Sequence, residues 1–236
     1  MIVYGRNAVR EALRGRRSVQ RVFATERAAR EVWLGGVETH TADSREIEER
    51  AGCPDHQGLC AEVGPYPYAD ADSLLDQPDA LVIALDEVQD PQNVGAVARV
   101  AESAGCSGLV LPERRSAEVT PAVCRASAGA VEHLPIAQVG NLATWLEQSK
   151  RQEGLWVYGA EAGASVPYDR PDYSGRVILV LGSEGRGLRP RVAETCDQLV
   201  HLPVRGQVGS LNVATAAAAL VYGILQFRGE TLDKAP

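Results

Sequence analysis

Short apolar runs alternate with longer amphipathic segments from residue 80 onward. The predicted strands are the apolar runs 81–85, 108–111, 134–137, 155–160, 177–181 and 199–202. The predicted helices are 91–104, 121–131, 141–152 and a long final helix that starts at Ser210. The run 177–181 has no polar face, so its strand should be buried on both sides. This alternation predicts an α/β fold with a mostly parallel sheet covered by helices.

The beginning of the chain shows a smaller version of the same pattern. Its predicted elements are helices at 7–13 and 45–51 and strands at 19–24 and 58–63. These elements predict a small α/β unit that is separate from the larger sheet.

Three prolines, Pro65, Pro67 and Pro78, and several aspartates lie between the two patterns. Proline lacks a backbone donor and disfavours helix in the residue before it, so this stretch is expected to be a linker. We therefore expect a small domain over 1–64, a linker over 65–79 and a larger domain over 80–236.

Composition places the chain among ordinary globular proteins. Hydrophobic residues make up 45% and charged residues 23% of the chain, and no apolar run has the length of a membrane span. The N-terminus lacks the apolar stretch of a signal peptide, so we expect a cytoplasmic protein. The five cysteines show no CxxC or Cys/His ligand spacing, which indicates reduced thiols and no metal site.

The charge is distributed unevenly. The net charge is −7, yet residues 1–30 contain eight arginines and only two acids, a local charge of +6 that leaves −13 on the remainder. A local basic patch is sufficient for contacts with nucleic-acid phosphates. A solvated, arginine-rich helix face is the alternative interpretation.

Three segments, 85–105, 180–188 and 202–219, place polar side chains at the end of a strand and the start of a helix. Open α/β sheets bind their ligands at such positions. The candidate functional side chains in these segments are Asn93, Arg99, Glu184, Ser210 and Asn212.

The first segment contains Asn93 in the first turn of a predicted helix and Arg99 among small residues. The Asn93 amide can orient a neighbouring side chain or a substrate, and the Arg99 guanidinium needs a carboxylate or phosphate partner. Considered individually, Asn93 can equally be ordinary helix-start polarity and Arg99 half of a structural ion pair.

The second segment, GSEGRG from Gly182, follows the buried strand and permits a tight turn. Its order is GxxGxG, so it is neither a dinucleotide fingerprint nor a P-loop, which disfavours a nucleotide-dependent oxidoreductase. Glu184 in this turn is expected to hold Asn93 or Arg99. In the third segment, Ser210 is a good N-cap for a nearly all-apolar helix, which we expect to be buried, with its polar start facing a partner or a ligand.

Together, in order and spacing, these segments resemble the three signature motifs of the SpoU (TrmH-type) class of SPOUT RNA methyltransferases. The leading segment, with YGRNAVREAL and HQGLCAEV, is similar to the family's N-terminal RNA-binding domain of L30e-like fold. The resemblance implies a SPOUT domain with a deep C-terminal trefoil knot. The strand and helix pattern alone favours an ordinary doubly wound sheet, because natural folds rarely thread loops.

The resemblance also implies a reaction, the transfer of a methyl group from S-adenosylmethionine (AdoMet) to a ribose 2′-hydroxyl in RNA. It implies a homodimer with no membrane or metal partner. It places the cofactor against backbone groups near Gly182, Leu202 and Leu211. The expected catalytic residues are Asn93, Arg99, Glu184, Ser210 and Asn212. Because arginine stays protonated, we expect Arg99 to bind phosphate and stabilise the developing oxyanion instead of acting as a base.

The expected substrate is a guanosine of bacterial 23S rRNA, because the similarity is greatest to enzymes with that target. A tRNA ribose methyltransferase of the same class is the close alternative. A non-catalytic RNA-binding module is a more distant one, which the presence of all five polar side chains disfavours.

Overall fold

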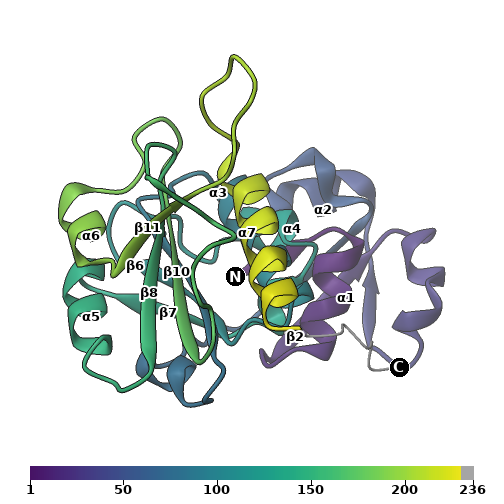
Figure 1. Ribbon diagram of the computed structural model, residues 1–236. Coiled ribbons are helices and arrows are strands. Elements are labelled where there is room, and N and C mark those ends of the chain that lie inside the picture. The colour runs from purple at the N-terminus through teal and green to yellow at the C-terminus, as the bar shows by residue number, and fades with distance from the viewer. Residues whose placement is uncertain (230–236) are drawn as a thin grey trace.

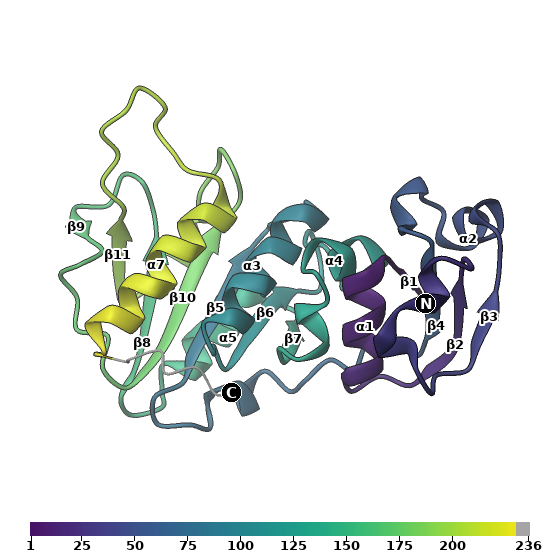
Figure 2. The same ribbon diagram turned by 90° about the vertical axis from the view of Figure 1, so that its right-hand side faces the viewer.

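The computed structural model describes residues 1–229, which form two β-sheets lying side by side. Figure 1 and Figure 2 show the small N-terminal sheet beside the larger sheet. In Figure 2, α7 lies across the face of the larger sheet that is turned toward the viewer. No helix in the described part of the chain is long and apolar enough to cross a membrane. Residues 230–236, the end of the expected larger domain, lie outside the described residues.

The small sheet has the strand order β1-β4-β2-β3. Its elements are β1 (Ile2–Tyr4), α1 (Arg6–Arg14), β2 (Val19–Ala24), β3 (Thr39–Thr41), α2 (Ser44–Ala51) and β4 (Leu59–Val63). Strand β4 pairs antiparallel with β1 and β2, and β3 is parallel to β2. The predicted strand at 19–24 has the observed bounds. The sequence pattern missed β1 and β3, which are too short to show a periodicity.

The large sheet is parallel throughout, with the order β7-β6-β5-β10-β8-β11-β9. Its strands are β5 (Leu81–Asp86), β6 (Gly108–Pro112), β7 (Ile136–Val139), β8 (Leu155–Ala160), β9 (Val166–Pro167), β10 (Arg176–Gly182) and β11 (Gln198–His201). Strand β10 lies between β5 and β8, and its residues 177–181 are buried, as its apolar sequence predicts.

Helices cover both faces of this sheet. They are α3 (Pro91–Ser103), α4 (Pro121–Ala126), α5 (Leu142–Ser149), α6 (Pro190–Thr195) and α7 (Val213–Phe227). Helices α3, α4 and α7 pack on one face, in a core that continues into the small sheet, and α5 and α6 pack on the other (Figure 1). The parallel α/β architecture predicted from the sequence is therefore present. The pattern missed the short elements α6 and β9.

Three predicted helix bounds are wrong by three residues or more. Helix α5 ends at Ser149 instead of 152. Helix α4 ends at Ala126 instead of 131, because Ala128 (φ 53°) and Gly129 (φ 89°) adopt left-handed backbone conformations that end the helix. Helix α7 begins at Val213, and its N-cap is Asn212 instead of Ser210. The Asn212 side chain accepts hydrogen bonds from the amides of Ala214 (2.9 Å) and Thr215 (3.4 Å), which satisfies two free donors of the first turn.

The segment 65–79, which connects the two sheets, is itself packed. The Tyr66 hydroxyl donates to the carbonyl of Val131 (2.8 Å), and the Tyr68 hydroxyl accepts from the amide of Val119 (3.0 Å). Leu74 and Leu75, in a 3₁₀ helix, are buried. This connection is therefore held along much of its length by contacts with the large sheet.

A buried ion pair also joins the two parts of the chain. Arg17 follows α1, and Glu132 lies after α4; both side chains are 1% exposed. The Arg17 guanidinium donates through Nε to Oε2 of Glu132 (2.9 Å) and through a second nitrogen to Oε1, a bidentate pairing. The same guanidinium contacts Cys124, and burial raises the pKa of that thiol to about 11. Arg17 is therefore not part of any basic surface.

Other arginines near the N-terminus are also partly neutralised. Arg6 pairs with Glu31, Arg10 and Arg14 pair with Glu11, and Arg21 lies 3.9 Å from Glu62. The local charge of +6 thus overstates the basic surface that this part of the chain presents.

Candidate active site

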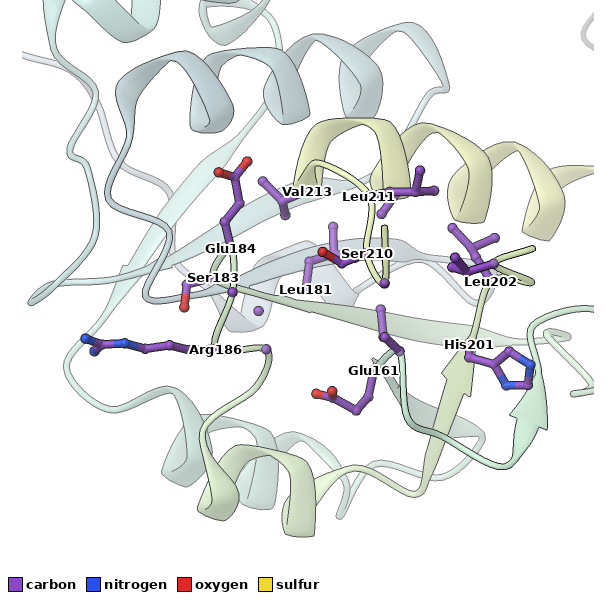
Figure 3. Close-up of a pocket in the computed structure, with 18 of the residues that line it drawn as sticks. Glu161, Leu181, Ser183, Glu184, Arg186, His201, Leu202, Ser210, Leu211 and Val213 are labelled. Atoms are coloured by element: carbon purple, nitrogen blue, oxygen red, sulfur yellow. The ribbon is translucent and has the colours of Figure 1, made fainter. Parts of the chain in front are cut away.

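A pocket of about 320 Å³ lies at the carboxyl ends of β8, β10 and β11. Its walls come from the residues after each of these strands and from the start of α7 (Figure 3). Gly182, Leu202 and Leu211, the three expected cofactor-binding residues, all line it, as do Glu184 and Ser210. The pocket therefore brings together the second and third polar segments.

Three side chains from distant parts of the chain form one hydrogen-bonded cluster beside this pocket. The Asn93 amide donates to Glu184 Oε1 (3.0 Å). The Asn212 amide donates to Glu184 Oε1 (2.6 Å) and to Asn93 Oδ1 (2.9 Å). Because each residue belongs to a different segment, the cluster ties the start of α3 and the start of α7 to the loop after β10.

Asn212 has a second role in this arrangement. Its Oδ1 caps α7 while its Nδ2 reaches Asn93 and Glu184, so both ends of one amide are used. Asn93 occupies the first turn of α3, which Asp90 caps through the amide of Gln92 (3.0 Å). The cluster is therefore attached to two helix starts, which limits its motion.

The glycine loop after β10 folds back on the strand end. Gly187 donates its amide to the carbonyl of Ser183 (3.0 Å), and Gly185 and Gly187 have positive φ (76° and 66°). A Cβ atom on Gly182 would lie 2.2 Å from the carbonyl carbon of Gly187, so only glycine fits there. Gly182 and Gly187 both line the pocket, so this close approach forms part of its wall.

An acidic anchor that the sequence reasoning missed lies at the other end of this loop. Asp86, the last residue of β5, is fully buried and accepts hydrogen bonds from Arg189, from its amide (2.8 Å) and from Nε (2.7 Å). The signal that the sequence offered for this anchor was an acidic residue directly after the apolar run 81–85. The Asp86–Arg189 pair fixes the chain where the glycine loop enters α6.

Arg99 is apart from the cluster. It is exposed on α3, it does not line the pocket, and residues 1–229 offer it no ion pair or hydrogen bond. The expectation that Glu184 holds Asn93 or Arg99 therefore applies to Asn93 only. Within one chain, the guanidinium is free to meet an external anion.

The expectation of a buried start for the last helix is wrong. Ser210, Leu211 and Asn212 are exposed, and so are several side chains along α7. The apolar composition predicted burial, but the packing of α7 against α3 covers only one side of the helix. Among the described residues, no group of three or more His, Cys, Asp or Glu side chains is placed to hold a metal ion.

Comparisons with protein families and known proteins agree with this geometry. The model of the SpoU rRNA Methylase family matches residues 80–222, and the model described as RNA 2′-O ribose methyltransferase substrate binding matches residues 2–69. A putative TrmH family tRNA/rRNA methyltransferase of Bacillus subtilis is 36% identical over 241 residues, which cover 96% of this chain and 95% of that protein.

Two further proteins extend the comparison. An uncharacterized tRNA/rRNA methyltransferase of Synechocystis is 35% identical over 97% of this chain, which spans only 63% of that longer protein. The crystal structure of an AdoMet-bound rRNA methyltransferase from Sinorhizobium meliloti matches with a TM-score of 0.80 and 25% identity. That match covers 95% of this chain and 86% of the other.

Proposed function

Because the chain belongs to the SpoU rRNA methylase family, we propose that it transfers a methyl group from AdoMet to the 2′-hydroxyl of a ribose in RNA. The observation that carries this proposal is the cluster of Asn93, Glu184 and Asn212 beside a pocket at the carboxyl edge of the sheet. The cluster combines polar side chains from all three segments at a site that has room for a small molecule.

The pocket residues fit the proposed cofactor. A volume of about 320 Å³ lies within the range of small-molecule sites, and the backbone near Gly182, Leu202 and Leu211 offers hydrogen-bonding groups to an adenosine. The Leu202, Val204 and Leu211 side chains provide an apolar surface for the adenine ring. When bound, AdoMet supplies an already activated methyl group, so the protein mainly has to position the acceptor.

We assign the remaining work to five polar side chains. Ser210, on the pocket wall, orients the acceptor hydroxyl, and Asn93, Glu184 and Asn212 hold the pocket edge in place. Arg99, exposed and without a partner among the described residues, binds the target phosphate and stabilises the developing 2′-oxyanion. The proton leaves to that phosphate or to water.

A homodimer is part of this proposal. Exposed apolar side chains lie at the start of α7 and along it, namely Leu211 (48% exposed), Tyr222 (40%) and Phe227 (49%). Arg99 lies on the neighbouring helix α3, so pairing through this side would let the subunits share Arg99. Sedimentation should give a dimer, and a monomer with full activity would contradict this arrangement.

The finer fold assignments remain proposals as well. We propose an L30e-like RNA-binding domain over 1–64 and a methyltransferase domain over 80–236 with a C-terminal trefoil knot. The substrate-binding family match to 2–69 supports the first. The knot requires the chain to cross back over the sheet after β11, and the chain does so where α7 packs against α3. An RNA-modifying role favours the cytoplasm.

We propose a guanosine of 23S rRNA as the target and a tRNA ribose as the alternative. The test is incubation with labelled AdoMet and, separately, unmodified rRNA and unmodified tRNA, followed by mass spectrometry of the nucleosides. A 2′-O-methylguanosine from rRNA is the expected product. Asn212→Ala, which breaks the cluster with Asn93 and Glu184, is the control that should give little of it. A methyl group on a base would contradict the mechanism. RNA binding without methylation would support the non-catalytic alternative.

Gly182→Ala should weaken AdoMet binding by about tenfold or more. The added Cβ would overlap the Gly187 backbone, so the loop must shift away, and such overpacking costs about 1–3 kcal/mol. Calorimetry with AdoMet and urea unfolding measure the two effects. Gly163→Ala is the control, because a Cβ there meets nothing within 4 Å. Equal affinities in the two variants would contradict the prediction.

A further inference from the structure

A second carboxylate, from Glu161, lies in the same pocket and has no role in the arrangement above. Glu161 directly follows β8, and its backbone amide donates to the carbonyl of Val200 (3.0 Å), which fixes the residue against β11. It is a pocket-lining residue, and Figure 3 shows it between Arg186 of the glycine loop and His201.

The Glu161 carboxylate has unused hydrogen-bonding capacity. Its one hydrogen bond within residues 1–229 comes from the amide of Leu188 (3.3 Å to Oε2), and no cation of that part of the chain forms an ion pair with it. An ionised carboxylate offers about four acceptor sites. A charge that lines a pocket with most of these sites free is suited to a ligand that donates hydrogen bonds.

The glycine loop makes room for this carboxylate. A Cβ on Gly187 would lie 2.5 Å from Glu161 Oε2, so any other residue there would displace it. Gly187 also has a φ of 66°, which favours glycine. The glycine therefore allows Glu161 to lie close to the loop backbone at the pocket wall.

The two ends of the pocket differ in chemistry. Ser183 and Glu184 lie at one end, beside the Asn93–Asn212 pair, and Leu202 lies at the other, with Glu161 between them (Figure 3). A nucleoside whose base meets the apolar end and whose reacting group meets the polar end has its sugar in the middle. Vicinal hydroxyls of that sugar would face the Glu161 oxygens.

We propose that Glu161 is a cofactor-positioning residue that accepts hydrogen bonds from the vicinal hydroxyls of the cofactor ribose. The inference rests on the proposed function, because it takes AdoMet as the ligand. Two carboxylate oxygens match two adjacent hydroxyl donors, and charge-assisted hydrogen bonds of this kind are stronger than neutral ones.

Calorimetry without RNA tests this role, with S-adenosylhomocysteine and its 2′-deoxy and 3′-deoxy analogues as probes. Glu161→Gln should bind S-adenosylhomocysteine about tenfold more weakly than the wild type, the effect of losing a charge-assisted hydrogen bond. Removing a ribose hydroxyl should cost the wild type a similar factor and cost the variant less than about threefold. Glu153→Gln, an exposed residue outside the pocket, is the matched control.

The outcomes separate the two proposals. If the wild type and Glu161→Gln discriminate equally against the deoxy analogues, the ribose role is wrong while AdoMet binding stands. If the variant loses affinity for AdoMet but keeps it for S-adenosylhomocysteine, the carboxylate senses the sulfonium charge, which also overturns the ribose role. Failure of the wild type to bind either molecule would contradict the proposed function. Thermal unfolding without ligand checks that the variant is folded, because glutamine keeps an acceptor for Leu188.

Discussion

Arg99→Ala should lower the rate of methyl transfer by about a hundredfold or more and leave AdoMet affinity within about twofold of wild type. The guanidinium is exposed and has no partner within residues 1–229, so its removal breaks no contact in that part of the chain. Losing one donor to a developing oxyanion costs about 10²–10³ in rate. Because Arg99 does not line the pocket, cofactor binding should not change.

Single-turnover methylation measures the first effect and calorimetry the second. Arg151→Ala is the matched control, since Arg151 is an exposed arginine outside the pocket. Arg99→Lys should recover little activity if two parallel hydrogen bonds to phosphate matter, because lysine is a point charge. Wild-type turnover in Arg99→Ala would exclude a catalytic role for this residue.

Glu132→Gln should destabilise the fold by about 3–5 kcal/mol, because it leaves the charge of Arg17 buried without a counter-ion. Urea unfolding of the two proteins gives this difference directly. Glu49→Gln is the control: it breaks an exposed pair with Arg45, for which a change below about 1 kcal/mol is expected.

A double variant separates the charge from the packing. Arg17→Met combined with Glu132→Leu should be more stable than Glu132→Gln, because it removes both buried charges and keeps apolar volume. If Glu132→Gln unfolds at the same urea concentration as Glu49→Gln, the buried pair contributes little to the stability of the fold.

The strands and helices with strong local patterns could be predicted from the sequence. The strands Val19–Ala24 and Leu155–Ala160 have the predicted bounds, and the buried strand β10 follows from its apolar run. Strands of two or three residues, such as β1 and β9, were missed because they are shorter than any detectable period. Helix starts depended on which side chain forms the cap, and sequence alone favoured Ser210 over Asn212.

The contact between Glu184 and Asn93 was expected from the sequence, whereas the place of Asn212 and the separation of Arg99 were not. Asn93, Glu184 and Asn212 were identified from their positions at strand and helix ends together with the resemblance to the family's motifs, and these three meet in one hydrogen-bonded cluster. Arg99 came from the same segments and does not join them. Glu161 was missed although, like Asp86, it is an acidic residue at the end of a strand, because such acids are common in α/β chains.

Local chemistry therefore determined which elements form, where glycine is required and which side chains stand at the carboxyl edge of the sheet. Tertiary structure alone decided that Asn93 and Asn212 touch, because residues 93 and 212 are 119 positions apart and meet only when α7 packs on α3. It also decided the partner of Arg17, since burial of its charge depends on Glu132, 115 positions away. Hydrophobic periodicity acts over a few residues, whereas such contacts depend on how the helices and sheets pack together.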